Sequence, residues 1–160
     1  MDNIIIYTNK YREQVIKLIF DVLEGEFGHQ SKSGRPDIQD IPEFYQADQK
    51  SNFWVAVNEK EEVIGTIGLS DCKNNKGYVS RLIVKKDERR KGMGKLLLDT
   101  LLNFAKSREY EEIYLSTSED MEAANSFYVK NGFQLIESFP EEVMNRSSWD
   151  NKFYKLKLTK

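Results

Sequence analysis

The sequence predicts an α/β protein of the α+β kind, built on a mixed, mostly antiparallel sheet of about seven strands with helices packed on it. Short β-branched runs and amphipathic stretches follow one another in the order β-α-α-β-β-β-α-β-α-β-β. Two successive turn signals in the middle of the chain are typical of an antiparallel meander. A strand–helix–strand unit comes next, and such a crossover joins parallel strands.

Length and composition indicate one domain over residues 1–160. A chain of this length buries a core without a disulfide or a metal. A single cysteine, Cys72, excludes an internal disulfide framework and a cysteine-based zinc site. A single histidine excludes a site made of several histidines, so we predict no metal.

Charge and the N-terminal region exclude other classes of partner. The net charge of −2 gives no basic excess, so we expect neither a nucleic-acid partner nor an anionic membrane. The apolar run Ile4–Ile6 has no basic residues before it and is far too short for a signal or membrane segment. We therefore expect a cytoplasmic, reduced setting and a monomer or homodimer.

The first part of the chain predicts one strand and two helices. Residues 3–8 read as the strand, and residues 10–24 carry apolar side chains at helical spacing up to a break at Gly25. Residues 37–46 indicate a short second helix, in which Pro42 obscures the boundaries.

The meander and the crossover occupy the middle of the chain. Residues 53–58 and 63–70 predict a hairpin, and residues 78–84 predict the central strand. From Met93 onward the apolar residues recur at helical spacing, and residues 112–117 form the strand that we expect parallel to the central one.

The last part of the chain predicts a helix and two strands. The helix spans residues 120–130, and Asn131-Gly132 is a good C-terminal stop. A strand begins within residues 132–137, and alternating side chains over 153–158 predict a closing antiparallel strand.

A basic, glycine-bearing turn between the central strand and the long helix is the most informative stretch. Residues 89–95 read RRKGMGK, and their two glycines let the backbone turn tightly and approach a ligand. The first turn of a helix has unpaired N–H groups and a positive partial charge. The turn is therefore a candidate seat for phosphate groups.

Two known phosphate-binding patterns do not fit this turn. A P-loop needs glycine at position 89 and serine or threonine at position 96, where the chain has Arg89 and Leu96. A dinucleotide fingerprint accepts Gly92 and Gly94 but needs a small residue at position 97, where the chain has Leu97.

A third pattern fits without a mismatch. Arg89-x-x-Gly92-x-Gly94 resembles the Arg/Gln-x-x-Gly-x-Gly/Ala signature of the GNAT superfamily, the acetyl-CoA-dependent N-acetyltransferases. The preceding Leu82-Ile83-Val84 looks like the Leu-x-Val strand of that family. Residues 123–133 are similar to its A-x-x-x-Tyr-x-x-x-Gly-Phe helix and turn. The resemblance covers residues 53–133 and implies a GNAT-like sheet with helices on both faces and a splayed parallel central pair.

The resemblance implies acetyl-CoA as co-substrate and a set of residues that hold it. The pantetheine arm would pair with the edge of the central strand, where a backbone N–H near Leu82 or Ile83 would polarise the thioester carbonyl. The pyrophosphate would lie on the basic turn. The predicted cofactor-binding residues are Leu82, Ile83, Val84, Arg89, Arg90, Lys91, Gly92, Met93, Gly94 and Lys95.

Tyr128 matches the tyrosine of the family that acts as general acid, and a phenol can donate a hydrogen bond to the leaving thiolate. The alternative is a half-buried aromatic residue with no chemical role. Family carboxylates that deprotonate the amine fall at positions where this chain has Tyr78 and Ser116, and a family asparagine is replaced by Met121.

The general base is therefore left open. Glu24, Glu26, Asp71, a relay of water or solvent alone are the alternatives. Glu26 and Arg81 are candidate contacts to the acceptor substrate. Arg81 can bind a substrate carboxylate bidentately or pair with an acidic neighbour across the sheet.

These observations predict an enzyme, an acyltransferase that moves acetyl from acetyl-CoA to a primary amine by direct attack. The acceptor is either a small amine or amino acid, or a protein amine. The competing interpretation is a non-catalytic acyl-CoA-binding sensor or regulatory module, which the missing family carboxylates and Met121 favour.

Overall fold

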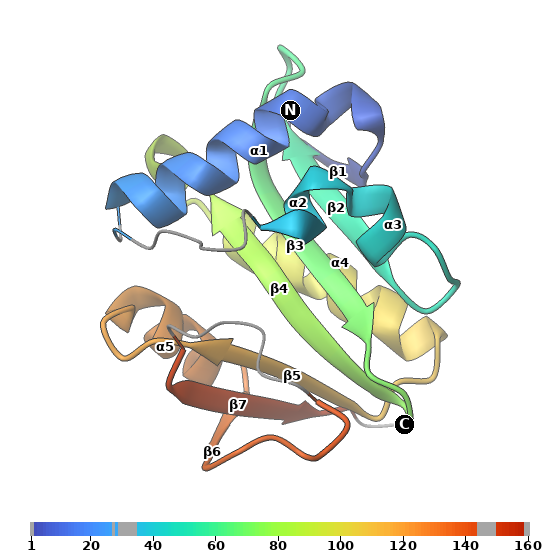
Figure 1. Cartoon of the computed structure of the whole chain (residues 1–160). Coiled ribbons are helices and arrows are strands. Elements are labelled where there is room, and N and C mark those ends of the chain that lie inside the picture. Colours follow the sequence, from blue (N-terminus) through green and yellow to red (C-terminus); the bar gives the residue numbers. More distant parts are fainter. Residues whose placement is uncertain (1, 27, 29–34, 144–149, 159–160) are drawn as a thin grey trace. The chain divides into compact units, whose positions relative to one another are not determined.

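The computed structural model in Figure 1 describes residues 2–26, 28, 35–143 and 150–158. The chain forms two compact units. Unit 1 comprises Met1–Ser70 and Ser80–Phe104, and unit 2 comprises Asp71–Val79 and Ala105–Lys160. The long strand β4 begins in unit 2 and ends in unit 1.

Helices and strands follow one another much as the pattern predicts. In order along the described chain they are β1 (Asn3–Ile6), η1 (Asn9–Tyr11), α1 (Arg12–Phe20), η2 (Asp21–Glu26), α2 (Pro36–Gln39), α3 (Ile41–Tyr45), β2 (Asn52–Val57), β3 (Val63–Asp71), β4 (Lys76–Val84), η3 (Lys86–Glu88), α4 (Met93–Ser107), β5 (Glu112–Thr117), α5 (Glu122–Lys130), β6 (Gln134–Ile136) and β7 (Lys152–Lys157).

Seven strands are hydrogen-bonded in the order β1-β2-β3-β4-β5-β7-β6 within the described residues. Strand β2 pairs antiparallel with β1 and β3, and β7 pairs antiparallel with β5 and β6. Strand β4 runs parallel to β5, with Lys76–Tyr78 facing Glu112–Tyr114. The predicted mixed, mostly antiparallel sheet with a parallel central pair is therefore confirmed.

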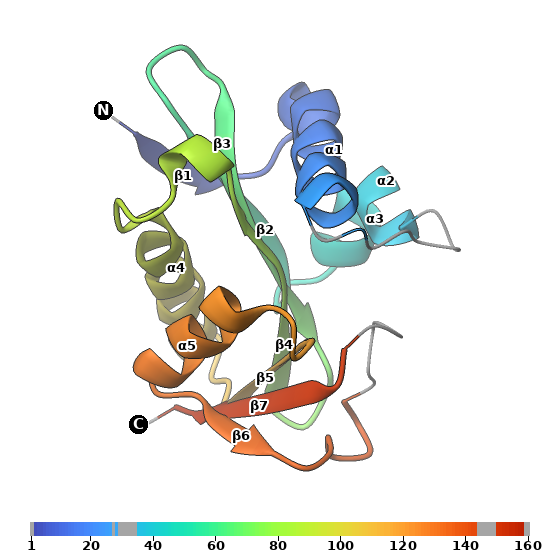
Figure 2. The same cartoon turned by 90° about the vertical axis from the view of Figure 1, so that its left-hand side faces the viewer.

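Strands β2 and β3 of unit 1 are apolar on both faces because helices cover both faces (Figure 2). Helices α1, α2 and α3 lie on one face and α4 lies on the other. Phe53 points toward the first group, with its ring 5.8 Å from that of Tyr7 and 5.1 Å from that of Tyr45. Its neighbour Trp54 points the opposite way and meets Phe104 of α4 at 5.1 Å, as strand alternation requires.

The first helical region differs from the prediction in two ways. It opens with the 3₁₀ turn η1 and ends in the π-helical turn η2, so Gly25 lies inside a helical turn instead of breaking it. The single helix predicted over residues 37–46 is two short helices. Asp40 separates them and accepts a hydrogen bond from the Glu43 amide at 3.3 Å, and Pro42 occupies the first turn of α3, where its missing N–H costs nothing.

Unit 2 packs α5 against the ladder β5-β7-β6 (Figure 2). Asn125 joins these elements: its amide nitrogen donates to the carbonyls of Ser118 and Met121, and its oxygen accepts from Thr117 and from the Tyr154 hydroxyl. This partly buried amide, with its oxygen and nitrogen both hydrogen-bonded, holds the start of the helix against β5 and β7.

The ends of α5 and β6 are shorter than predicted. Helix α5 begins at Glu122, two residues after the predicted start, and β6 is limited to Gln134–Ile136. The predicted stop at Asn131-Gly132 is correct, because Gly132 has a φ of 95° and its amide donates to the Val129 carbonyl at 3.1 Å. Among the described residues, no helix is both long enough and apolar enough to cross a membrane.

Gly68 provides a test of the packing that holds Tyr45 in place. A Cβ at this position would lie 2.8 Å from Phe53 Cδ2 and 2.9 Å from Tyr45 Cε1, two rings that pack against each other and cannot rotate away. We predict that Gly68→Ala lowers the free energy of unfolding by about 2 kcal/mol in urea titrations. Gly25→Ala is the matched control, because its Cβ would meet no atom within 4 Å. Equal stability of the two variants would contradict this packing.

Candidate functional site

The basic turn that connects β4 to α4 is held by its own backbone contacts. Arg89 Nε donates to the Val84 carbonyl at 2.8 Å, which folds the turn back onto the end of β4. Arg90 and Gly92 have left-handed φ angles of 64° and 87°. A Cβ at Gly92 would meet nothing within 4 Å, so the φ angle, not the lack of space, favours glycine there.

The start of α4 presents backbone amides beside a mixed set of charges. The Leu96 amide donates to the Gly92 carbonyl at 3.1 Å, which leaves the amides of the preceding turn without helical acceptors. Lys95 pairs with Asp99 at 3.0 Å, and Lys91 lies 3.8 Å from Glu88. The ten predicted cofactor-binding residues therefore lie on one continuous stretch of unit 1, from the end of β4 into the first turn of α4.

Strand β4 contains a kink at Arg81, just before the predicted strand edge. Arg81 has a φ of 58°, a left-handed conformation that costs a non-glycine residue about 1–3 kcal/mol. The Arg81 carbonyl accepts a hydrogen bond from the buried Thr66 hydroxyl of β3 at 2.7 Å. The kink is therefore fixed from the sheet side.

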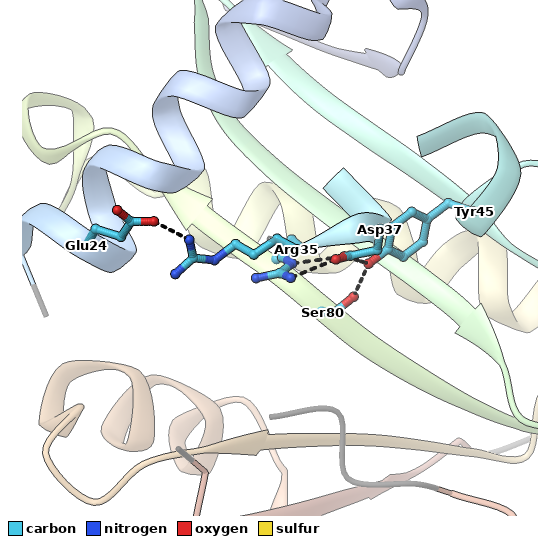
Figure 3. A network of polar contacts seen from close by, with 6 residues as sticks. Glu24, Arg35, Asp37, Tyr45 and Ser80 are labelled. Carbon is cyan, nitrogen blue, oxygen red and sulfur yellow. Dashed lines mark hydrogen bonds and ion pairs between the residues drawn. The ribbon is translucent and has the colours of Figure 1, made fainter. Parts of the chain in front are cut away.

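Asp37 of α2 fixes the kink from the helix side (Figure 3). Arg81 donates from Nε to Asp37 Oδ2 at 3.0 Å and from Nη2 to Asp37 Oδ1 at 2.8 Å, a bidentate pair. The Tyr45 hydroxyl donates to Asp37 Oδ2 at 2.7 Å and lies 2.8 Å from Ser80 Oγ. The side chain of Arg81 and that of the preceding Ser80 are thus both tied to α2 and α3.

The pKa values in this network result from burial and from the pairing. Burial alone would raise the pKa of Asp37, but the hydrogen bonds and charge of Arg81 outweigh it, and the pKa is lowered. Burial would lower the pKa of Arg81, but Asp37 raises it. Burial and the Asp37 charge raise the pKa of Tyr45 well above its ordinary value. Near neutral pH the network therefore consists of a carboxylate, a guanidinium and a neutral phenol.

Glu24 lies at the other end of this region in Figure 3 and is paired as well. Arg35 Nη1 donates to Glu24 Oε2, and the Arg35 guanidinium carbon lies 4.9 Å above the ring of Phe20. Arg35 is 5% exposed and has a φ of 52°. An ion pair that accounts for the position of Glu24 makes it a weaker candidate for the base.

Three further residues were predicted as contacts to the acceptor substrate or as the general base: Arg81, Glu26 and Asp71. Arg81 is occupied by Asp37, which is the second of its two predicted roles, although Asp37 lies on a helix and not in the sheet. The side chain of Glu26 lies outside the described part of the chain. Asp71 accepts from the Lys73 amide at 3.2 Å and lies 3.8 Å from the Lys73 ammonium.

Tyr128 of unit 2 lies on α5 inside an aromatic cluster. Its ring centroid is 5.5 Å from that of Phe133 and 6.3 Å from that of Tyr154, and only 7% of the residue is exposed. Burial raises its pKa well above the ordinary value, and the nearby Tyr78 and Asp150 raise it further. Tyr128 is therefore a phenol that keeps its proton at neutral pH.

Sequence patterns missed Asp37 and Tyr45. Both are ordinary residues of short helices, and their importance comes only from contact with β4, since Asp37 and Arg81 are 44 residues apart in the chain. Within the described residues no group of three or more His, Cys, Asp or Glu side chains is placed to hold a metal ion.

The Asp37–Arg81 pair has a predicted effect on stability. Asp37→Asn removes the negative charge and one of the two oxygens that bind the largely buried Arg81 guanidinium. We therefore expect a loss of about 2–4 kcal/mol in the free energy of unfolding at pH 7. Because the pKa of Asp37 is lower in the folded protein, this contribution is complete above about pH 4 and is lost below it, as Asp37 of the wild type becomes protonated.

Chemical unfolding at pH 7, 5 and 3 measures this difference. Asp21→Asn is the control, because Asp21 pairs with Lys17 at 2.6 Å on an exposed helix face, where such pairs contribute little. A difference between Asp37→Asn and wild type that stays constant down to pH 3, or that grows there, would contradict the assignment.

Comparison with known proteins places the chain in one family. The sequence profile of the Acetyltransferase (GNAT) family matches residues 16–133. N-acetyltransferase 8B of Rattus norvegicus is 34% identical over 109 residues, which are 65% of this chain and 49% of that protein. The chain thus spans about half the length of this curated relative.

Comparison with solved structures also identifies GNAT-family acetyltransferases as similar proteins. A GNAT-family acetyltransferase from Staphylococcus aureus Mu50 is 31% identical, with a TM-score of 0.94 over 99% of this chain and 100% of that one. The PaiA N-acetyltransferase of Thermoplasma acidophilum, solved in complex with coenzyme A, is 19% identical and shares the fold, with a TM-score of 0.78 over 99% of both chains. The resemblance found in the sequence is confirmed: the chain belongs to the acetyltransferase (GNAT) family.

Proposed function

We propose that this protein is an acetyltransferase that moves an acetyl group from acetyl-CoA to a primary amine by direct attack of the amine nitrogen. Family membership supports the reaction class. The observation that carries the proposal is the kinked end of β4 leading directly into the glycine-bearing turn before α4. We further propose that residues 1–160 form one such domain.

Acetyl-CoA fits this stretch of unit 1. The amides before Leu96, together with Arg89, Arg90 and Lys95, suit the pyrophosphate, because a helix N-terminus favours negative charge. The peptide-like pantetheine arm can pair with the strand edge at Leu82–Val84. Coenzyme A in the structure of the Thermoplasma acidophilum relative supports acyl-CoA as the co-substrate.

The kink at Arg81 suits the carbonyl chemistry. A left-handed residue interrupts the regular ladder at this point of the strand, which supports an N–H near Leu82 or Ile83 as the donor to the thioester oxygen. Charge develops on that oxygen in the transition state, where a fixed donor is worth about 3–4 kcal/mol. Because the kink is preformed, no reorganisation is needed at that moment.

Tyr128 is the proposed general acid for the leaving thiolate. Its raised pKa keeps the phenol protonated over the range in which an amine can react. The acceptor belongs to one of two classes, a small amine or amino acid, or a protein N-terminus or lysine. We further propose a cytoplasmic monomer or homodimer, and the net charge of −2 supports the absence of nucleic-acid or membrane partners.

The second candidate is a non-catalytic acyl-CoA sensor, favoured by Tyr78 and Ser116 at positions where family members carry carboxylates. Release of free CoA from acetyl-CoA separates the two. The panel consists of putrescine, glycine, lysine and a short peptide with a free N-terminus. Amine-dependent release with at least one of them supports the enzyme. Tight acetyl-CoA binding with no release above the amine-free rate for any of them would favour the sensor.

Gly94→Glu tests the phosphate seat. A carboxylate in the first turn of α4 adds bulk and negative charge where the pyrophosphate would lie, so we expect acetyl-CoA affinity to fall at least about 100-fold in calorimetric titration. Asn103→Glu adds the same charge on the exposed side of the same helix and should leave affinity unchanged. Equal affinities for Gly94→Glu and wild type would exclude this turn as the seat.

Tyr128→Phe tests the general acid. Removing the hydroxyl keeps the ring packing, so we expect kcat to fall about 10²-fold while the Kd for acetyl-CoA changes less than about threefold. Tyr114→Phe is the control, because that hydroxyl donates to Glu112 at 2.8 Å in the same unit. Losses of equal size in kcat and in affinity would show that Tyr128 supports binding instead of proton transfer.

A further inference from the structure

Three oxygen-bearing side chains of unit 2 form a continuous hydrogen-bonded chain that ends on a carboxylate. The Tyr78 hydroxyl of β4 lies 2.6 Å from Ser116 Oγ of β5. Ser116 Oγ donates to Asp150 Oδ2, also at 2.6 Å. Asp150 lies just before the last strand, 34 residues from Ser116, so three separate segments of the chain meet at these side chains.

The number of hydroxyl protons determines which group donates in each of these hydrogen bonds. Serine has a single hydroxyl proton, and that proton is donated to Asp150. Ser116 can therefore only accept from Tyr78, so both protons point toward the carboxylate. The hydrogen bond from Ser116 fixes where one of the Asp150 oxygens lies.

Burial is graded along the chain of hydrogen bonds. Tyr78 is buried in a cluster with Cys72, Tyr114 and Val143, and its ring meets Phe139 edge-on at 5.8 Å. Ser116 and Asp150 are only partly buried. Tyr78 therefore lies in the core, whereas Asp150 is partly accessible to a molecule in solvent.

The same carboxylate acts on the proposed general acid. Burial raises the pKa of Tyr128 first, and the charges of Tyr78 and Asp150 add to the effect. Strand pairing places the two groups in the same part of unit 2: Ser116, which holds Asp150, pairs with Phe153 in the β5–β7 ladder, and the ring of the next residue, Tyr154, lies 6.3 Å from that of Tyr128. A carboxylate and a phenol that keeps its proton are suited to opposite proton transfers, the first as acceptor and the second as donor.

We propose that Asp150 binds the acceptor as an ammonium ion and accepts its proton, with Ser116 and Tyr78 as positioning residues. The inference rests on the proposed acetyl transfer and adds the class of acceptor, a cationic primary amine. Asp150 first takes one proton from the bound ammonium and releases it to solvent, so that the neutral nitrogen has a lone pair with which to form the C–N bond. The C–S bond then breaks and the sulfur takes the Tyr128 proton. The second N–H proton leaves through Asp150 to solvent, and Tyr128 is reprotonated from solvent.

Asp150→Asn is the primary test, because asparagine keeps an oxygen that accepts from Ser116 but cannot accept a proton. With the best amine of the panel we expect kcat/KM to fall about 10²–10³-fold. The Kd for acetyl-CoA and the melting temperature should stay close to wild type. Ser116→Ala should lose about tenfold. Glu142→Gln is the matched control, because Glu142 is a carboxylate of the same unit that accepts from Asn74 at 2.8 Å, and it should retain full activity.

Hydroxylamine distinguishes proton transfer from a structural role, because this acceptor is already neutral at pH 7 and needs no proton removed before it attacks. Asp150→Asn should use it with a loss of less than about fivefold, far smaller than for the alkylamine. Equal losses for both acceptors, retained alkylamine activity, or a loss of acetyl-CoA binding would each overturn the assignment of Asp150. Absence of amine-dependent CoA release by the wild type would instead contradict the proposed function, and the assignment with it.

Discussion

The left-handed backbone of Arg81 is the constraint on which unit 1 depends. A side chain in this conformation is unfavourable, so neighbours must hold it there. Thr66 binds its carbonyl from β3, and Asp37 binds its guanidinium from α2. The same residue thus joins the sheet to the helices that cover it. The strand edge after Arg81 and the turn into α4 both take their direction from this point.

Unit 2 has a different chemistry. Two of its polar networks are built on side-chain hydroxyls: Asn125 binds the Tyr154 hydroxyl and links α5 to β7, and the Ser116 hydroxyl links β5 to Asp150. Burial within this unit raises the pKa of Tyr128, so its phenol stays neutral. The backbone donors proposed for the cofactor lie in unit 1, and the side chains proposed for proton transfer lie in unit 2.

Local patterns were sufficient for most strands, for α4 and for the basic turn, because periodicity and glycine positions depend on neighbours in the sequence. They failed where long-range contacts decide. Gly25 was expected to end the first helix, but it lies inside the π-helical turn η2. Asp37 and Asp150 were missed because nothing beside them in the sequence distinguishes them, and their partners are 44 and 34 residues away. Positions 78 and 116, where family members carry a base, have hydroxyls in this chain, and the carboxylate bound to them comes from a different segment.

Calorimetric titration of the purified protein with acetyl-CoA, with ATP and NAD as competitors for the same turn, tests the central claim most directly. A kinked strand edge that leads into a helix N-terminus should bind acetyl-CoA selectively, because only that ligand offers both a peptide-like arm and a pyrophosphate. We predict one site per chain and at least about tenfold weaker binding of ATP and NAD. No binding of acetyl-CoA, or equal binding of ATP or NAD, would contradict the account of this site.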